Sequence, residues 1–192
     1  MKNIGRREFV KLSSLGLAGL MLPENLSAEA DLKIIDHPSP KRRTRPNRAS
    51  TNYILLHTTE SPSESSLNSL TRFGNANYMV DTNGEIYRIM GPNQISTGAG
   101  RSMWNGKTNL DNHAINIEFV GYHNRKPTSR QLESGGELIS ELRSIRRGIS
   151  DQEIMPHSMV AYGAPNKWHR RSHRGRKRCG MLFAKEEIRR AL

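Results

Sequence analysis

The chain has 192 residues, 34% of them hydrophobic, with 30 lysines and arginines against 18 acidic residues. This length suits one domain with a tail rather than two full domains, and no apolar run reaches the roughly 18 residues of a membrane-spanning helix. The single cysteine excludes an internal disulfide, and the net charge of +12 predicts a polyanionic partner. That partner could be nucleic acid, an anionic membrane surface or an anionic polymer such as cell wall.

Residues 1–30 have the segment order of an export signal. The pair Arg6 and Arg7 comes first, a mildly apolar stretch over 12–22 follows, and Ala30 closes a small-x-small cleavage site. The arginine pair and the weakly apolar centre resemble a twin-arginine signal. We therefore expect export by the twin-arginine machinery to the periplasm. The alternative is an amphipathic N-terminal helix of the mature protein.

The next segment, residues 31–52, holds three prolines and a basic run over 41–45. Prolines at this density disfavour regular structure. We predict a basic N-terminal arm or linker over 31–52 and a folded domain over 53–192.

A strand and a helix are the first elements predicted in this domain. The apolar run over 53–56 is typical of a buried strand, and His57 follows it. Ser61 can cap a helix with Pro62 at its first position, and Gly74 can end that helix.

Further patterns complete the predicted domain. Asn83 and Gly84 lie between two short apolar runs and predict a hairpin. Residues 114–119 alternate between apolar and polar, which predicts a strand with an apolar face and a polar face. Residues 128–147 and 184–191 have the pattern of helices, the first with a capping box. Strands interspersed with helices predict an α/β domain with one sheet covered by helices.

Three residues that lie far apart in the sequence could ligate zinc. His57, His157 and Cys179 would together give the two-His, one-Cys set of some catalytic zinc sites. The chain has no Cys-x-x-Cys and no His-Glu-x-x-His, which excludes a zinc finger and the familiar helical metalloprotease site. Spacing alone leaves open that the histidines are structural.

The surroundings of Cys179 and Glu118 also predict chemistry. Cys179 lies in a basic segment, 175–180, whose cations predict a lowered thiol pKa; the alternative is a small buried residue. Glu118 lies on the polar face of an otherwise apolar strand, where a carboxylate is costly unless it is paired. It is a candidate general base, and the alternative is a solvent-facing side chain.

Two basic segments, 41–48 and 170–178, could contact phosphates. Aromatic residues make up only 6% of the chain, however, and they form no interleaved stacking platform. Together with the expected export, this argues against nucleic acid as the partner.

Several segments occur in the order of one known family. They read YILLHTT at 53–59, ANYMVDTNGEIY at 76–87, SMWNG at 102–106, AINIEFVG at 114–121, HS at 157–158 and GRKRCGMLF at 175–183. Over about residues 50–190 the chain resembles the zinc-dependent N-acetylmuramoyl-L-alanine amidases, whose superfamily includes the peptidoglycan recognition proteins. The resemblance implies a single α/β domain with a central mixed β-sheet flanked by helices. It also implies hydrolysis of the amide between N-acetylmuramic acid and L-alanine in peptidoglycan.

The resemblance assigns a role to each candidate residue. It implies Zn²⁺ held by His57, His157 and Cys179, the third ligand being Cys in some members and Asp in others. Glu118 would be the catalytic base toward zinc-activated water, and Lys177 would help to hold the oxyanion. The expected partners are peptidoglycan or muropeptides, and a monomer is favoured.

Two departures from the family pattern bear on the substrate. An aromatic-His pair often seen before Ala-Gly is replaced by Thr97 and Gly98, and the segment between His157 and Lys177 is lengthened. The alternative function is a non-catalytic peptidoglycan-binding module. Such proteins typically lack the third ligand, which Cys179 supplies here.

Overall fold

The computed structural model describes residues 32–165, 167, 170–171, 173–174 and 177–192. The predicted export signal over 1–30 lies outside these residues. Leu32–Leu192 forms a unit of its own. Within the described part of the chain, every helix is too short or too polar to cross a membrane.

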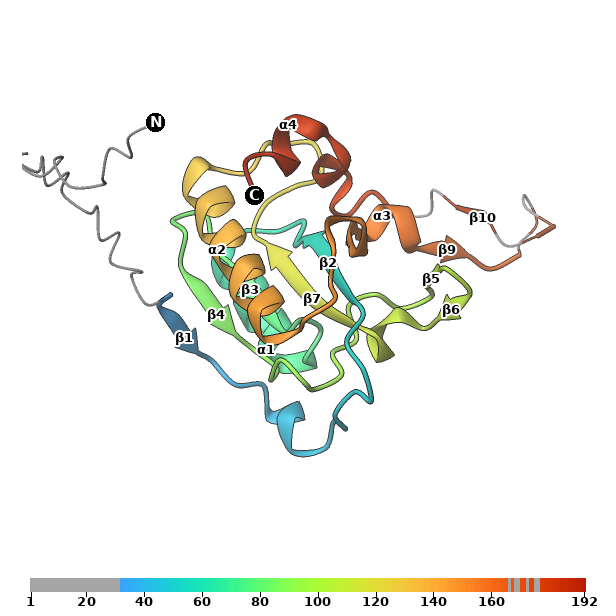
Figure 1. Ribbon diagram of the computed structural model, residues 1–192, viewed down its shortest axis with the longest axis horizontal. Coiled ribbons are helices and arrows are strands. Elements are labelled where there is room, and N and C mark those ends of the chain that lie inside the picture. The colour runs from blue at the N-terminus through green and yellow to red at the C-terminus, as the bar shows by residue number, and fades with distance from the viewer. Residues whose placement is uncertain (1–31, 166, 168–169, 172, 175–176) are drawn as a thin grey trace, which may run out of the picture. The chain divides into compact units, whose positions relative to one another are not determined.

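A six-stranded mixed sheet organises this unit, with its strands in the order β1-β4-β3-β7-β2-β8 (Figure 1). β3 and β4 are antiparallel, and all other neighbours are parallel. The central mixed sheet implied by the resemblance is confirmed. The strands are β1 (Ile34–Asp36), β2 (Tyr53–Thr58), β3 (Tyr78–Val80), β4 (Ile86–Arg88), β7 (Ala114–Phe119) and β8 (Ile154–Pro156).

Helices and two small ribbons surround the sheet. The ribbons are β5 (Met103–Trp104) with β6 (Lys107–Thr108), and β9 (Tyr162–Gly163) with β10 (His173–Arg174). The α-helices are α1 (Ser63–Phe73), α2 (Ser129–Ile145), α3 (His157–Val160) and α4 (Glu186–Arg189). The 3-10 helices are η1 (Pro40–Arg43), η2 (Leu110–Asn112), η3 (Asp151–Glu153) and η4 (Met181–Ala184).

The two faces of the sheet pack against different helices (Figure 1). On one face, Leu138 of α2 belongs to the same buried cluster as Ile54 of β2 and Ile115 of β7. On the other face, Leu70 of α1 packs with Met79 of β3. Because successive side chains of a strand point to opposite faces, β7 buries its isoleucines under α2 and turns its polar side chains to the other face.

The ends of α1 and the start of α2 lie where the local sequence signals predict them, except that α1 begins one residue later. The capping box of α2 and the end of α1 at Gly74 are confirmed, and Gly74 has a left-handed φ of 64°. The predicted start of α1 is wrong by one residue: the helix begins at Ser63, and Pro62 is its N-cap. The Ser61 hydroxyl makes no capping bond and lies 2.7 Å from the Ser66 hydroxyl instead.

The segment over 31–52 contributes an edge strand to the sheet. Strand β1 pairs in parallel with β4. The Arg42 side chain donates to the carbonyl of Ile89 at 2.9 Å. This bond holds the basic η1 against the segment that follows β4. A three-residue strand just before a proline-rich stretch has too short a pattern to be seen in the sequence.

Candidate metal centre and active site

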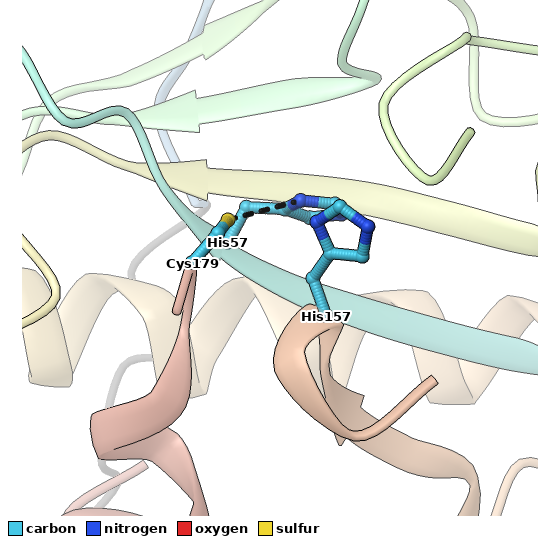
Figure 2. A group of neighbouring side chains, drawn as sticks. All are labelled: His57, His157 and Cys179. Atoms are coloured by element: carbon cyan, nitrogen blue, oxygen red, sulfur yellow. Dashed lines mark hydrogen bonds between the residues drawn. The ribbon is translucent and has the colours of Figure 1, made fainter. Parts of the chain in front are cut away.

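The three predicted ligands meet beside the carboxyl end of β2 (Figure 2). His57 is the penultimate residue of β2, His157 begins α3 directly after β8, and Cys179 lies in the loop before η4. Their ligand atoms all lie within 4.8 Å of one another. Nδ1 of His57 is 3.5 Å from Sγ of Cys179. The carboxyl ends of the parallel neighbours β2 and β8 thus bring the two histidines together, as is usual for α/β sites, and the loop before η4 adds Cys179.

The loop that carries Cys179 is fastened to β2. The Thr58 N–H donates to Sγ of Cys179 at 3.3 Å, and the Gly180 N–H donates to the Thr58 hydroxyl at 3.0 Å. Gly180 has a φ of +73°, and a Cβ there would lie 2.2 Å from the carbonyl oxygen of Leu56. Only glycine allows this close approach, so Gly180 is what lets the thiol reach the histidines.

Each histidine has an oxygen acceptor at Nε2 that orients its ring. Nε2 of His57 is 2.9 Å from Oδ1 of Asn116, and Nε2 of His157 is 2.9 Å from the carbonyl oxygen of Ala99. An acceptor at Nε2 places the ring proton there and the lone pair on Nδ1. Burial, with a smaller contribution from His157, lowers the pKa of His57 well below its usual value. Neutral imidazoles and a sulfur are donors that suit zinc, and the group could bind a metal.

The predicted lowering of the Cys179 pKa is wrong for the metal-free chain. Burial, aided by the nearby Glu118 carboxylate, raises the pKa of this thiol to about 12. Cations that are close in sequence are outweighed by desolvation, which favours the neutral form. Because a metal binds the thiolate, metal uptake by this site must release a proton.

Glu118 lies beside the ligand cluster and is only 8% exposed, so the solvent-facing alternative is wrong. Its Oε1 is 3.7 Å from Nδ1 of His57, and its Oε2 makes no hydrogen bond to the described residues. The pKa of this carboxyl is raised to about 8, chiefly by burial and in part by Glu60, while the Lys177 ammonium acts in the opposite direction. Lys177 is exposed, and its charge also lowers the pKa of His57, so its field reaches the site.

A cavity of about 200 Å³ opens beside Glu118. Its other lining residues, mostly hydroxyl or amide side chains, are Thr59, Ser61, Ser66, Ser69, Leu70, Asn75, Thr97 and Gly98. A Cβ on Gly98 would lie 2.4 Å from the carbonyl oxygen of Asn75 and 3.4 Å from Cγ of Asn116. The main chain at Asn75 therefore occupies the space that the Cβ of a histidine at position 98 would need, and the side chain of Asn116 lies in van der Waals contact beside it.

The roles of Asn116 and Ala99 were not predicted from the sequence. Asn116 shares the polar face of β7 with Glu118, and this second polar residue on an otherwise apolar strand was the available signal. The carbonyl of Ala99 leaves no trace in side-chain patterns. Six residues of the lengthened segment, 166, 168–169, 172 and 175–176, lie outside the described part of the chain.

Solved structures with the same fold include an endolysin and N-acetylmuramoyl-L-alanine amidases. A mutant endolysin from Bacillus subtilis is 19% identical, with 83% of this chain and 97% of that chain covered and a TM-score of 0.57. The amidase LysC from Clostridium intestinale URNW is 18% identical, with 69% and 87% covered and a TM-score of 0.56. AmiD from E. coli is 21% identical, with 61% and 53% covered and a TM-score of 0.53. At these identities the likeness establishes the fold.

No curated protein matches the chain. The family model described as N-acetylmuramoyl-L-alanine amidase matches residues 46–179, which is well over half of the chain and includes all three members of the ligand cluster. The chain belongs to the N-acetylmuramoyl-L-alanine amidase family.

Proposed function

We propose that this member of the family is a zinc-dependent hydrolase that cleaves the amide between N-acetylmuramic acid and L-alanine in peptidoglycan or muropeptides. The convergence of His57, His157 and Cys179 beside the buried Glu118 carries the proposal. The E. coli AmiD structure contains the substrate anhydro-N-acetylmuramic acid-L-Ala-D-γ-Glu-L-Lys, which supports this substrate class.

The proposed cofactor is Zn²⁺. Three protein ligands are the number typical of catalytic rather than structural zinc sites. His57, His157 and Cys179 would hold the ion. When bound, zinc supplies a Lewis acid and lowers the pKa of coordinated water toward about 7.

Glu118 would move the proton during hydrolysis. Its Oε2, which makes no hydrogen bond to the described residues, offers the lone pair that accepts a proton from the attacking water. The same carboxyl then donates that proton to the alanine nitrogen as the C–N bond breaks. The Lys177 ammonium would stabilise the negative charge on the carbonyl oxygen.

The cavity and the charge of the chain support a polar, anionic substrate. Hydroxyl and amide side chains dominate the wall beside Glu118, and such groups can hydrogen-bond a sugar or a peptide. The net charge of +12 favours association with a wall polymer whose stem peptides bear carboxylates.

Fragment analysis tests the proposal directly. The chain without residues 1–30 is incubated with purified peptidoglycan, with and without a zinc chelator, and the released material is identified by mass spectrometry. We expect free stem peptides that begin at L-alanine, their loss on chelation and their return when zinc is restored. Firm binding to peptidoglycan without release would instead establish the non-catalytic binding module.

We also propose that residues 1–30 direct export through the twin-arginine machinery to the periplasm. The adjacent Arg6 and Arg7, before a weakly apolar stretch, support this. Replacing both arginines with lysine should retain the full-length chain in the cytoplasm, as measured by cell fractionation and immunoblotting. Undiminished export of this variant would contradict the proposal.

A further inference from the structure

We propose that Asp111 is a positioning residue that orients both histidines of the metal centre at once. This inference rests on the proposed metal-binding role of His57 and His157. Asp111 lies in η2, just before β7. The Asp111 carboxylate acts on each histidine through one intermediate group, which bonds to both.

The route to His57 runs through the side chain of Asn116. Nδ2 of Asn116 donates to Oδ1 of Asp111 at 2.9 Å and to the Ser96 hydroxyl oxygen at 2.7 Å. Because a carboxylate can only accept, the amide must turn its nitrogen to Asp111 and its oxygen to His57. That oxygen lies 2.9 Å from Nε2 of His57, which places the ring proton there and the lone pair on Nδ1, toward Cys179.

The route to His157 runs through the main chain. Oδ2 of Asp111 accepts the Gly100 N–H at 3.1 Å, and Oδ1 accepts the Ala99 N–H at 2.9 Å. The Gly100 N–H and the Ala99 carbonyl belong to one peptide plane, and this carbonyl faces Nε2 of His157 at 2.9 Å. Asp111 therefore holds the N–H side of the plane whose oxygen orients the histidine.

The chemistry of the cluster requires a carboxylate. Three N–H donors, from Ala99, Gly100 and Asn116, converge on the two oxygens of Asp111. An asparagine at position 111 would have one oxygen and one NH₂ group, so in either orientation an NH₂ would face at least one donor. Asn116 is fully buried and Ala99 nearly so, which keeps water from replacing a lost bond.

The test compares Asp111→Asn with a matched control, Asp81→Asn. Asp81 also accepts a main-chain and a side-chain bond, from Thr82 and Ser63, but it does so in the β3–β4 turn. The dissociation constant for zinc is measured by competition with a chromophoric chelator, at a temperature where each metal-free variant stays folded. We expect Asp111→Asn to weaken zinc binding about 10- to 100-fold and Asp81→Asn to leave it unchanged. Equal effects of the two substitutions would overturn the proposal.

A second readout uses the metal-free chain. Nitrogen NMR of the imidazoles should show the Nε2–H tautomer for both histidines in the wild type. In Asp111→Asn it should show Nδ1–H forms or exchange broadening at both. Unchanged spectra would overturn the positioning role. A wild type that binds no zinc would instead refute the proposed metal centre, and the spectra would still decide the role of Asp111.

Asn116→Ala cuts the route to His57 and leaves the route to His157 intact. It is also the variant that tests the proposal if Asp111→Asn does not fold. It should weaken zinc binding and alter the imidazole signals of His57, while those of His157 stay as in the wild type. In this background Asp111→Asn should reduce zinc affinity by a smaller factor than it does alone, since one of its two routes is already cut. The same factor in both backgrounds would indicate that Asp111 acts by charge alone, which contradicts the proposal.

Discussion

Glu118→Gln should abolish most of the hydrolysis while leaving the metal in place. The amide keeps the shape of the side chain but cannot accept a proton from water, and positioned general bases contribute about 10²- to 10⁴-fold to rate. We expect a fall of that size in the release of stem peptides, with an unchanged zinc content by elemental analysis. The fold of the metal-free chain should tolerate the change, because burial and Glu60 raise the pKa of this carboxyl to about 8 there and so favour its neutral form. The positive charge of a bound zinc ion would favour the carboxylate that acts as the base.

Two results would distinguish other roles for Glu118. Wild-type turnover in Glu118→Gln would remove its assignment as the base. Loss of zinc together with activity would make it a support for the ligands, since its Oε1 lies 3.7 Å from Nδ1 of His57. The control is Glu85→Gln, an exposed carboxylate in the β3–β4 turn, which should retain full activity.

His57→Ala should remove zinc and hydrolysis together. The substitution deletes one of three protein ligands and leaves His157 and Cys179 as an incomplete set. We expect the zinc content to fall from about one ion per chain to background and the release of stem peptides to fall with it. Elemental analysis and the peptidoglycan assay measure the two effects on the same sample.

The appropriate control is His37→Ala. His37 lies edge-on to Tyr87, beside the β1–β4 edge of the sheet and outside the ligand cluster. This variant should keep both zinc and activity. Full zinc content in His57→Ala would contradict the ligand assignment, whereas retained zinc without activity would place His57 among the residues that act on substrate.

Sequence patterns predicted the elements whose signals are local. The alternation over 114–119, the capping box of α2 and the Asn83 and Gly84 turn each concern neighbouring residues, and the structure has all three. Strands β1 and β8 were missed because each has only three residues and is defined by its pairing with a distant strand. Pairing partners are a property of the fold and are absent from the local pattern.

The candidate site likewise has features that the sequence predicts and features that depend on the fold. The grouping of His57, His157 and Cys179 was expected from the family resemblance, since residues separated by up to 122 positions carry no spacing signal. The pKa of Cys179 was mispredicted because charges can be counted in the sequence, whereas burial cannot. The contacts of Asp111 were missed for a related reason, since two of its three donors are main-chain groups that every residue possesses.

The crowding at Gly98 has a consequence for evolution and engineering. A first side-chain atom at this position would lie 2.4 Å from the Asn75 carbonyl oxygen, so the main chain at Asn75 would have to move to admit the histidine that often precedes Ala-Gly in this family. The loop at Asn75 would have to change with it. This is epistasis: the effect of a substitution at position 98 depends on the conformation of the loop at Asn75. A designer who wishes to graft that histidine should begin from the neighbours and change position 98 last.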